Sequence, residues 1–143
     1  MSFLGEYQHS IDPKGRLIVP SKLRYELTDD QAVVTRWVDN SIALWSAEGW
    51  KAQETKLLAL GQSNPQARAL VRSVAASAFP EAVDKQGRIL LPESLRDHAG
   101  ITRECVITGA ISHAEIWSPE GWAAEQAKTG DGGLDEIAAG LSF

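Results

Sequence analysis

The sequence contains one cysteine and three histidines among its 143 residues. The lone Cys105 excludes an internal disulfide framework and favours a reducing, cytoplasmic environment. The histidines, His9, His98 and His113, are scattered, so they do not have the spacing of a metal site. We therefore expect no metal and no cofactor. The sequence also shows no nucleophile–base pair, paired carboxylates or phosphate-binding loop, which makes an enzyme the least favoured class of function.

Long apolar runs and an excess of positive charge are also missing. No run approaches the ~20 residues of a membrane-spanning helix, and no cleavable signal is recognised. We therefore expect no membrane partner. The formal net charge is −5, which argues against binding nucleic acid with the whole surface. A nucleic-acid partner would need a local basic patch.

What the sequence does contain is an internal repeat. Residues 12–24, DPKGRLIVPSKLR, return as residues 84–96, DKQGRILLPESLR. Residues 44–50, LWSAEGW, return as residues 116–122, IWSPEGW. Both matches have the same offset of 72 positions, and no gap separates them. The chain is therefore a tandem duplication of one small module.

The first copy has the pattern of a small β-rich module. Alternating apolar residues predict a strand at 7–11, and apolar runs predict strands at 17–19, 32–35 and 41–45. Asp, Pro and Gly between the first two strands are favoured in a type I turn. A module of about 40 residues is too small to close a core alone, so the two copies must pack together.

Helices are expected between the copies and after the second one. The composition of 47–60 predicts a helix, and Asn64 with Pro65 favours the start of another. Ser46 and Ser118 have the residue type and position of helix N-caps. These elements divide the chain into a first module at 5–47, a helical insert at 48–76, a second module at 77–119, and a C-terminal helix and tail at 120–143.

Two resemblances follow from these motifs. The D-x-x-G-R turn, with its aliphatic run and proline, resembles the swapped-hairpin module of AbrB-type bacterial transition-state regulators. Two such modules, the opening Phe3-Leu4-Gly5-Glu6-Tyr7 and the helix leading to Ala76 together resemble the MraZ family, from Phe3 to about Trp122. The resemblance implies an α+β, β-rich fold in which two pseudo-symmetric swapped-hairpin modules pack as a small β-barrel with flanking helices.

The same resemblance implies a function and partners. It implies a transcription regulator, cytoplasmic and nucleoid-associated, that binds repeated sites in double-stranded DNA. These sites would lie upstream of the bacterial division and cell-wall gene cluster. The resemblance further implies self-association into a ring-shaped homo-oligomer, and it implies no small-molecule substrate.

Basic residues around the first turn are the candidate DNA contacts. The segment 12–24 has four basic residues against one acidic residue, whereas 84–96 has three against two. A hairpin that carries lysine and arginine can enter the major groove, where arginine binds guanine with two hydrogen bonds. The predicted DNA-binding residues are Lys14, Arg16, Lys22, Arg24 and Arg88. The residues predicted to shape the two turns are Asp12, Gly15, Asp84 and Gly87.

Other interpretations of these residues stay open. Arg16 and Arg88 could pair with acidic neighbours and join the modules, and Lys14 and Arg24 could belong to a solvated surface. The tryptophans that recur in both copies favour packing over base stacking. Trp37 has no counterpart in the second copy and fits a surface or a subunit interface. The main alternative function is a protein-interaction module of the antitoxin type, although the short C-terminal tail makes a poor inhibitor arm.

Overall fold

The computed structural model describes residues 2–142, so Phe143 of the predicted tail lies outside the described residues. Two short 3₁₀ turns, η1 (Thr28–Asp30) and η2 (Val38–Asn40), flank one strand of the first half. The first half contains β1 (Glu6–Ser10), β2 (Arg16–Ile18), α1 (Ser21–Arg24), β3 (Gln31–Arg36), β4 (Ile42–Ser46), α2 (Ala47–Leu60) and α3 (Pro65–Ala76). The second half contains β5 (Phe79–Ala82), β6 (Arg88–Leu90), α4 (Glu93–Ala99), β7 (Glu104–Gly109), β8 (Ala114–Trp117), α5 (Pro119–Ala127) and α6 (Gly133–Gly140).

Side-chain caps fix where three of the helices begin. The Ser46 hydroxyl accepts the N–H of Gly49 at 3.0 Å at the start of α2, and the Ser118 hydroxyl accepts the N–H of Gly121 at 2.9 Å at the start of α5. The Asn64 side chain accepts a backbone N–H at 2.8 Å in front of α3. These contacts satisfy donors that a helix leaves free in its first turn. The three predicted caps are confirmed.

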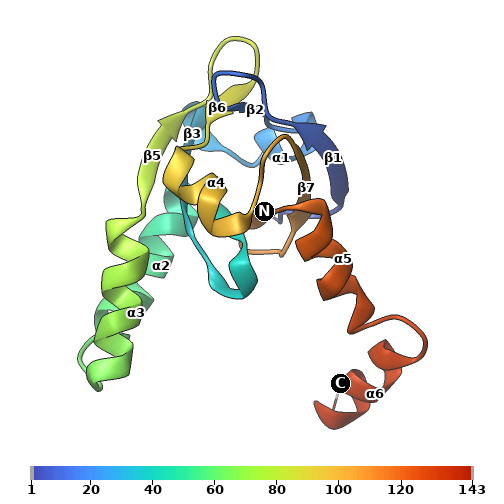
Figure 1. Ribbon diagram of the computed structural model, residues 1–143. Coiled ribbons are helices and arrows are strands. Elements are labelled where there is room, and N and C mark those ends of the chain that lie inside the picture. Colours follow the sequence, from blue (N-terminus) through green and yellow to red (C-terminus); the bar gives the residue numbers. More distant parts are fainter. Residues whose placement is uncertain (1, 143) are drawn as a thin grey trace.

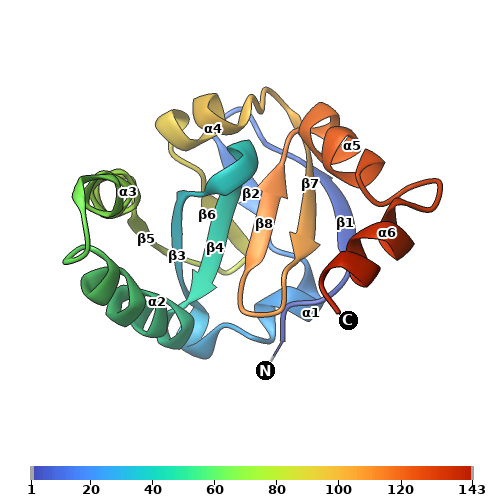
Figure 2. The same ribbon diagram turned by 90° about the horizontal axis from the view of Figure 1, so that it is seen from below.

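The two halves of the chain exchange strands. Six strands form one antiparallel sheet in the order β1-β7-β8-β4-β3-β5 (Figure 2). In this order β1 of the first half pairs with β7 of the second, and β5 of the second half pairs with β3 of the first. Neither half therefore completes its own sheet. The module boundaries at 5–47 and 77–119 stay a prediction.

The remaining two strands make a separate antiparallel ribbon. The strands β2 and β6 pair over three residues each, and they lie between the two outer strands of the large sheet (Figure 1). The α+β class and the tandem arrangement are confirmed. The barrel part of the prediction needs a correction, because no closed barrel forms within residues 2–142. The sheet stays open because β2 and β6 pair with each other and leave β1 and β5 as its edges.

The hydrophobic core is shared between both copies. The inner faces of the ribbon, the large sheet, α1 and α4 enclose one cluster, which includes the equivalent residues Leu17 and Ile89, each 1% exposed. A smaller cluster around Trp45 covers the other side of β3 and β4. In each copy a buried tryptophan contacts the tryptophan five residues later, with ring centroids 6.2 and 5.6 Å apart. The prediction that these tryptophans serve packing is confirmed.

Candidate nucleic-acid interface

The two D-x-x-G-R turns have nearly the same hydrogen bonds. In the first, one oxygen of the Asp12 carboxylate accepts the backbone N–H groups of Lys14 and Arg16, each at 2.9 Å. In the second, Asp84 accepts the equivalent N–H groups of Gln86 and Arg88, also at 2.9 Å. These backbone hydrogen bonds are the main cause that lowers the pKa of both carboxyl groups below their ordinary value. Each aspartate thus accepts two backbone N–H groups of its own turn, which supports the turn-shaping role predicted for both.

The glycine of each turn lies against an arginine from the other copy. Gly15 and Gly87 have φ of +82° and +80°, a conformation that favours glycine. A Cβ atom placed on Gly15 would lie 3.2 Å from the Arg96 guanidinium, and one on Gly87 would lie 3.2 Å from the Arg24 guanidinium. Each turn is thus supported by the partner module.

The β2–β6 ribbon holds the two turns side by side at one end of the molecule, away from the helices α2, α3, α5 and α6 (Figure 1). Its pairing places Arg16 opposite Leu90 and Ile18 opposite Arg88. All four side chains share the outer face, because directly paired residues of an antiparallel ribbon point the same way. Ile18 and Leu90 are 48% and 43% exposed. The outer face therefore combines two arginines with two aliphatic side chains.

The two arginines on this face differ in their partners. Arg88 donates to the Asp84 carboxylate at 3.0 Å and lies 3.6 Å from the Asp12 carboxylate, so it links the two turns. Arg16 has no ion pair among residues 2–142. For Arg88 the structure shows the pairing that the sequence left open as an alternative. Only Arg16 offers its guanidinium to an outside partner without first leaving a carboxylate.

Arg24 also has an acidic partner, on the surface of the protein. Its guanidinium donates two hydrogen bonds to the Asp30 carboxylate at 3.1 and 3.2 Å, and this pairing lowers the pKa of Asp30. The equivalent residue of the second copy, Arg96, instead donates to the backbone carbonyl of Leu91 at 3.0 Å. A DNA contact by Arg24 stays a prediction; in this structure its guanidinium binds Asp30 and lies beside Gly87 of the second turn.

The two predicted lysines and two further arginines complete the basic face. Lys14 at the tip of the first turn and Lys22 on α1 are exposed and unpaired among the described residues. Arg96 and Arg103 line a surface hollow together with Arg16. The sequence prediction left out Arg96 and Arg103. Arg103 follows α4 by several residues, and no local motif places it next to the turn of the other copy.

The left-handed backbone of the first turn gives a stability prediction. Gly15→Ala should lower the free energy of unfolding by about 1–2 kcal/mol, because the added Cβ strains the turn and meets Arg96. Urea unfolding followed by circular dichroism measures this loss. Gly100→Ala is the matched control, since Gly100 has φ of +67° with nothing within 4 Å of the added Cβ. An equal loss in both variants would mean that the contact with Arg96 adds nothing.

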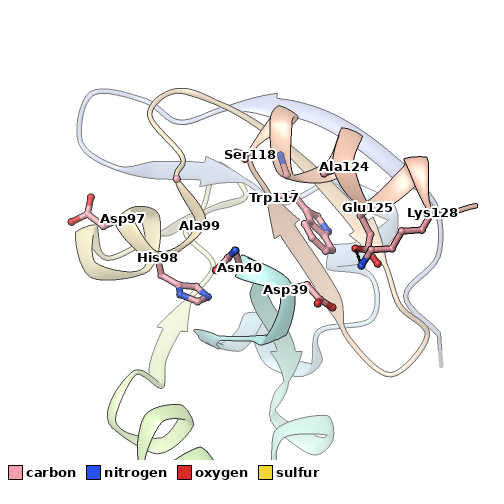
Figure 3. Close-up of a pocket in the computed structure, with 12 residues that line it drawn as sticks. Asp39, Asn40, Asp97, His98, Ala99, Trp117, Ser118, Ala124, Glu125 and Lys128 are labelled. Carbon is pink, nitrogen blue, oxygen red and sulfur yellow. Dashed lines mark hydrogen bonds and ion pairs between the residues drawn. The ribbon is translucent and has the colours of Figure 1, made fainter.

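A second hollow lies at the junction of η2, α4 and α5, and its side chains are drawn in Figure 3. Lys128 pairs with Glu125 there at 2.8 Å. Both nitrogens of His98 are occupied, because Nδ1 accepts from Arg36 at 3.3 Å and Nε2 contacts the Trp37 carbonyl at 3.1 Å. His98 is therefore not free to act as a base in this hollow.

His113 has partners that sequence inspection did not place. Its Nδ1 lies 2.9 Å from the Ser112 hydroxyl, and its Nε2 lies 3.0 Å from the Glu115 carboxylate. Its ring stacks on Trp45 with centroids 4.4 Å apart. The contacts from Ser112 through His113 to Glu115 resemble those of a nucleophile, a base and an acid. The hollow beside Ser112 is, however, also lined by two glutamates. Their charge would oppose an oxyanion, so the contacts favour packing over catalysis.

The part of the chain that the structure describes contains neither a group of metal ligands nor a helix that could span a membrane. No group of three or more histidine, cysteine, aspartate or glutamate residues among 2–142 could hold a metal ion. None of the described helices is long and apolar enough to cross a membrane. Cys105 is 2% exposed, and burial raises the pKa of its thiol to about 12. It is thus the buried strand residue that its apolar neighbours predict.

The fold and the paired turns define a tandem protein of two interleaved β-hairpin modules with one shared basic face. A family model described as "MraZ protein, putative antitoxin-like" matches residues 2–73 and 75–139. These two matches cover both halves of the duplication. The chain belongs to the MraZ family.

Curated relatives of the chain carry the name "Transcriptional regulator MraZ". The protein of Thermomicrobium roseum is 46% identical over 123 residues, which cover 86% of each chain. The protein of Limosilactobacillus fermentum is 44% identical over 145 residues, which cover 99% of each chain. The chain is therefore a member of a family of transcriptional regulators, which is not a class of enzymes. The solved structure of PHS018 from Pyrococcus horikoshii aligns with 83% of this chain and 98% of its own, at 16% identity and with a TM-score of 0.33.

Proposed function

We propose that the chain binds double-stranded DNA in a sequence-specific manner through the outer face of the β2–β6 ribbon and the two adjoining turns. The observation that carries this proposal is the position of Arg16, which lies on an exposed ribbon without an acidic partner among the described residues. A two-stranded ribbon fits the major groove, and a free guanidinium can bind guanine O6 and N7. Lys14 and Lys22 supply phosphate contacts beside it.

The proposed targets are repeated sites upstream of the bacterial division and cell-wall gene cluster. One chain offers few basic groups, and its formal net charge is −5. Self-association into a ring would place several ribbons next to each other, so that repeated sites are bound with a gain in effective concentration. The protein would then act in the cytoplasm on the nucleoid.

The salt dependence of binding tests this proposal. The affinity for a fragment carrying the chain's own upstream repeats should fall steeply between 50 and 200 mM salt, because each phosphate contact releases a counterion. Fluorescence anisotropy with a labelled fragment gives the slope, and a fragment of the same length with scrambled repeats is the control. A flat salt response, or equal affinity for both fragments at every salt concentration, would contradict the proposal.

A further inference from the structure

The surface hollow beside the first turn is lined by four arginines, two from each copy of the module or its ribbon strand. Arg16 and Arg88 lie on the β2–β6 ribbon, Arg96 lies on α4, and Arg103 lies between α4 and β7. Among the described residues of its wall, Asp12 is the single acidic one. We call this site the arginine hollow. Its volume of about 600 Å³ is large enough for a phosphate group.

The Asp12 carboxylate is already engaged by groups of the protein. One of its oxygens accepts the backbone N–H groups of Lys14 and Arg16, each at 2.9 Å. Its other oxygen lies 3.6 Å from the Arg88 guanidinium. Four basic side chains against this one acidic side chain give the arginine hollow an excess of positive charge, which attracts an anion.

Two guanidinium groups of the hollow are open to such an anion. Arg96 donates from Nε to the Leu91 carbonyl at 3.0 Å and has no ion pair among residues 2–142. Arg103 lies 3.8 Å from Glu104, but these side chains are 79% and 67% exposed. An exposed pair of this kind contributes little. Because arginine offers several N–H donors at once, it is well suited to the oxygens of a phosphate group.

The duplication provides a counterpart of the arginine hollow at the second turn. The offset of 72 positions places Asp30 where the hollow has Thr102. Asp30 accepts two hydrogen bonds, at 3.1 and 3.2 Å, from Arg24, which is the counterpart of Arg96. The arginine that is open to an anion at the first turn is therefore paired with a carboxylate at the second.

Two other substitutions between the copies balance in charge. Gln31 stands where the hollow has Arg103, and Lys85 stands where it has Pro13. Both places therefore have the same number of basic residues, four, while the second turn has two acidic residues against one at the first. The additional acid is Asp30. Its pairing with Arg24 is thus what distinguishes the two turns electrostatically.

We propose that the arginine hollow binds one phosphate group of the DNA backbone through Arg96 and Arg103, and that the second turn has no equivalent site because Asp30 occupies Arg24. The inference rests on the proposed DNA binding, and it names the residues that hold the backbone on one side of the ribbon. Contacts to phosphate position a protein on the duplex without a preference for bases. The hollow should therefore add the same affinity to every DNA sequence.

The substitution Arg103→Gln tests the hollow, because glutamine is the residue at the counterpart position. The slope of log affinity against log salt should become shallower by about one unit per bound chain. The affinities for repeat-bearing and scrambled fragments should fall by the same factor. Arg68→Gln, the same substitution at an exposed position of α3, is the matched control and should keep the wild-type slope. An unchanged slope in Arg103→Gln, measured by fluorescence anisotropy, would overturn the inference.

The opposite change at the second turn tests why that turn lacks the site. Asp30→Asn removes the carboxylate that occupies Arg24, so the salt slope should become steeper by about one unit per bound chain. Asp29→Asn is the matched control, because it removes the same charge one position earlier. The two residues have φ of +55° and +52°, which asparagine tolerates. An equal change of slope in both variants would mean that net charge decides, and the proposed difference between the turns would be wrong.

Neutral groups placed in the DNA identify what the hollow holds. A methylphosphonate can replace one phosphate at a time along the repeat. At one position the wild type should lose affinity while Arg103→Gln loses none. Equal losses in both proteins at every position would contradict a backbone phosphate in the hollow. If a free phosphate compound were the occupant, pyrophosphate would bind the wild type but not Arg103→Gln in calorimetry, while both had the same salt slope. This result would also overturn the inference.

These outcomes separate the inference from the proposed DNA binding. A wild type that binds neither the repeat-bearing nor the scrambled fragment would remove both proposals. Sequence-specific binding by the wild type, together with an unchanged slope in Arg103→Gln, would remove the phosphate site alone. Circular dichroism of each variant checks that the fold is retained.

Discussion

Replacing Arg16 by alanine should remove binding to repeat-bearing DNA in a gel shift, while the mass of the multimer and the circular dichroism spectrum stay unchanged. A single arginine–guanine contact contributes about 1–3 kcal/mol. Several copies would bind one promoter fragment together, so the loss would be multiplied over the subunits. Arg16 has no ion pair among the described residues, and its removal leaves no carboxylate without a partner.

Two further variants show whether the effect belongs to this position. Arg88→Ala should weaken binding less than Arg16→Ala does, because Arg88 already lies against Asp84 and Asp12. Some weakening is still expected, because removing Arg88 leaves the Asp84 and Asp12 carboxylates without this partner, and they would then repel the phosphates of the DNA. Arg68→Ala changes the net charge of the chain by the same amount, but Arg68 is an exposed residue of α3, away from the turns (Figure 1). Arg68→Ala should bind like the wild type.

Several outcomes would count against the first turn as the recognition element. Arg16→Ala could retain both its affinity and its preference for repeated sites, or Arg68→Ala could lose as much affinity as Arg16→Ala. The first result would move recognition to other residues. The second would mean that net charge alone decides binding. Measurement at two salt concentrations separates these cases, since a lost phosphate contact lowers the salt slope.

Local features of the structure could be predicted from the sequence because their causes are local. The turn around Asp12 needs an acceptor side chain, two backbone donors and a glycine within five residues, all of which the sequence shows directly. The helix starts at Ser46 and Ser118 follow for the same reason. The offset of 72 positions then carries each of these features to the second copy.

Contacts between the two halves could not be predicted in this way. The placement of Arg24 against Gly87, and of Arg96 against Gly15, depends on how the ribbon crosses the sheet. Arg24 was predicted to contact DNA from its charge alone, since nothing near it in the sequence shows that Asp30 would bind it with two hydrogen bonds. The open sheet in place of a barrel has the same origin, because strand pairing over long distances leaves no local pattern.

The shared core leads to the second large effect. Leu17→Ala should lower the free energy of unfolding by about 2–5 kcal/mol, because Leu17 is 1% exposed and lies opposite Ile89 of the other copy. Ile18→Ala is the matched control one residue along the same strand, where the side chain is 48% exposed. Its loss should be within about 0.5–1 kcal/mol. Urea unfolding at one fixed protein concentration measures both variants, since association also adds to apparent stability.

The same experiment shows whether the two copies form one cooperative unit. The strands β1 and β5 each complete the sheet of the other half, so damage to the first copy must also loosen the second. Tryptophan fluorescence and circular dichroism should therefore give coincident curves with one midpoint, shifted to lower urea in Leu17→Ala. A second, unshifted transition would mean that the second copy folds without the first. The duplication would then be two neighbouring domains, whereas the exchange of strands requires one core built from both copies.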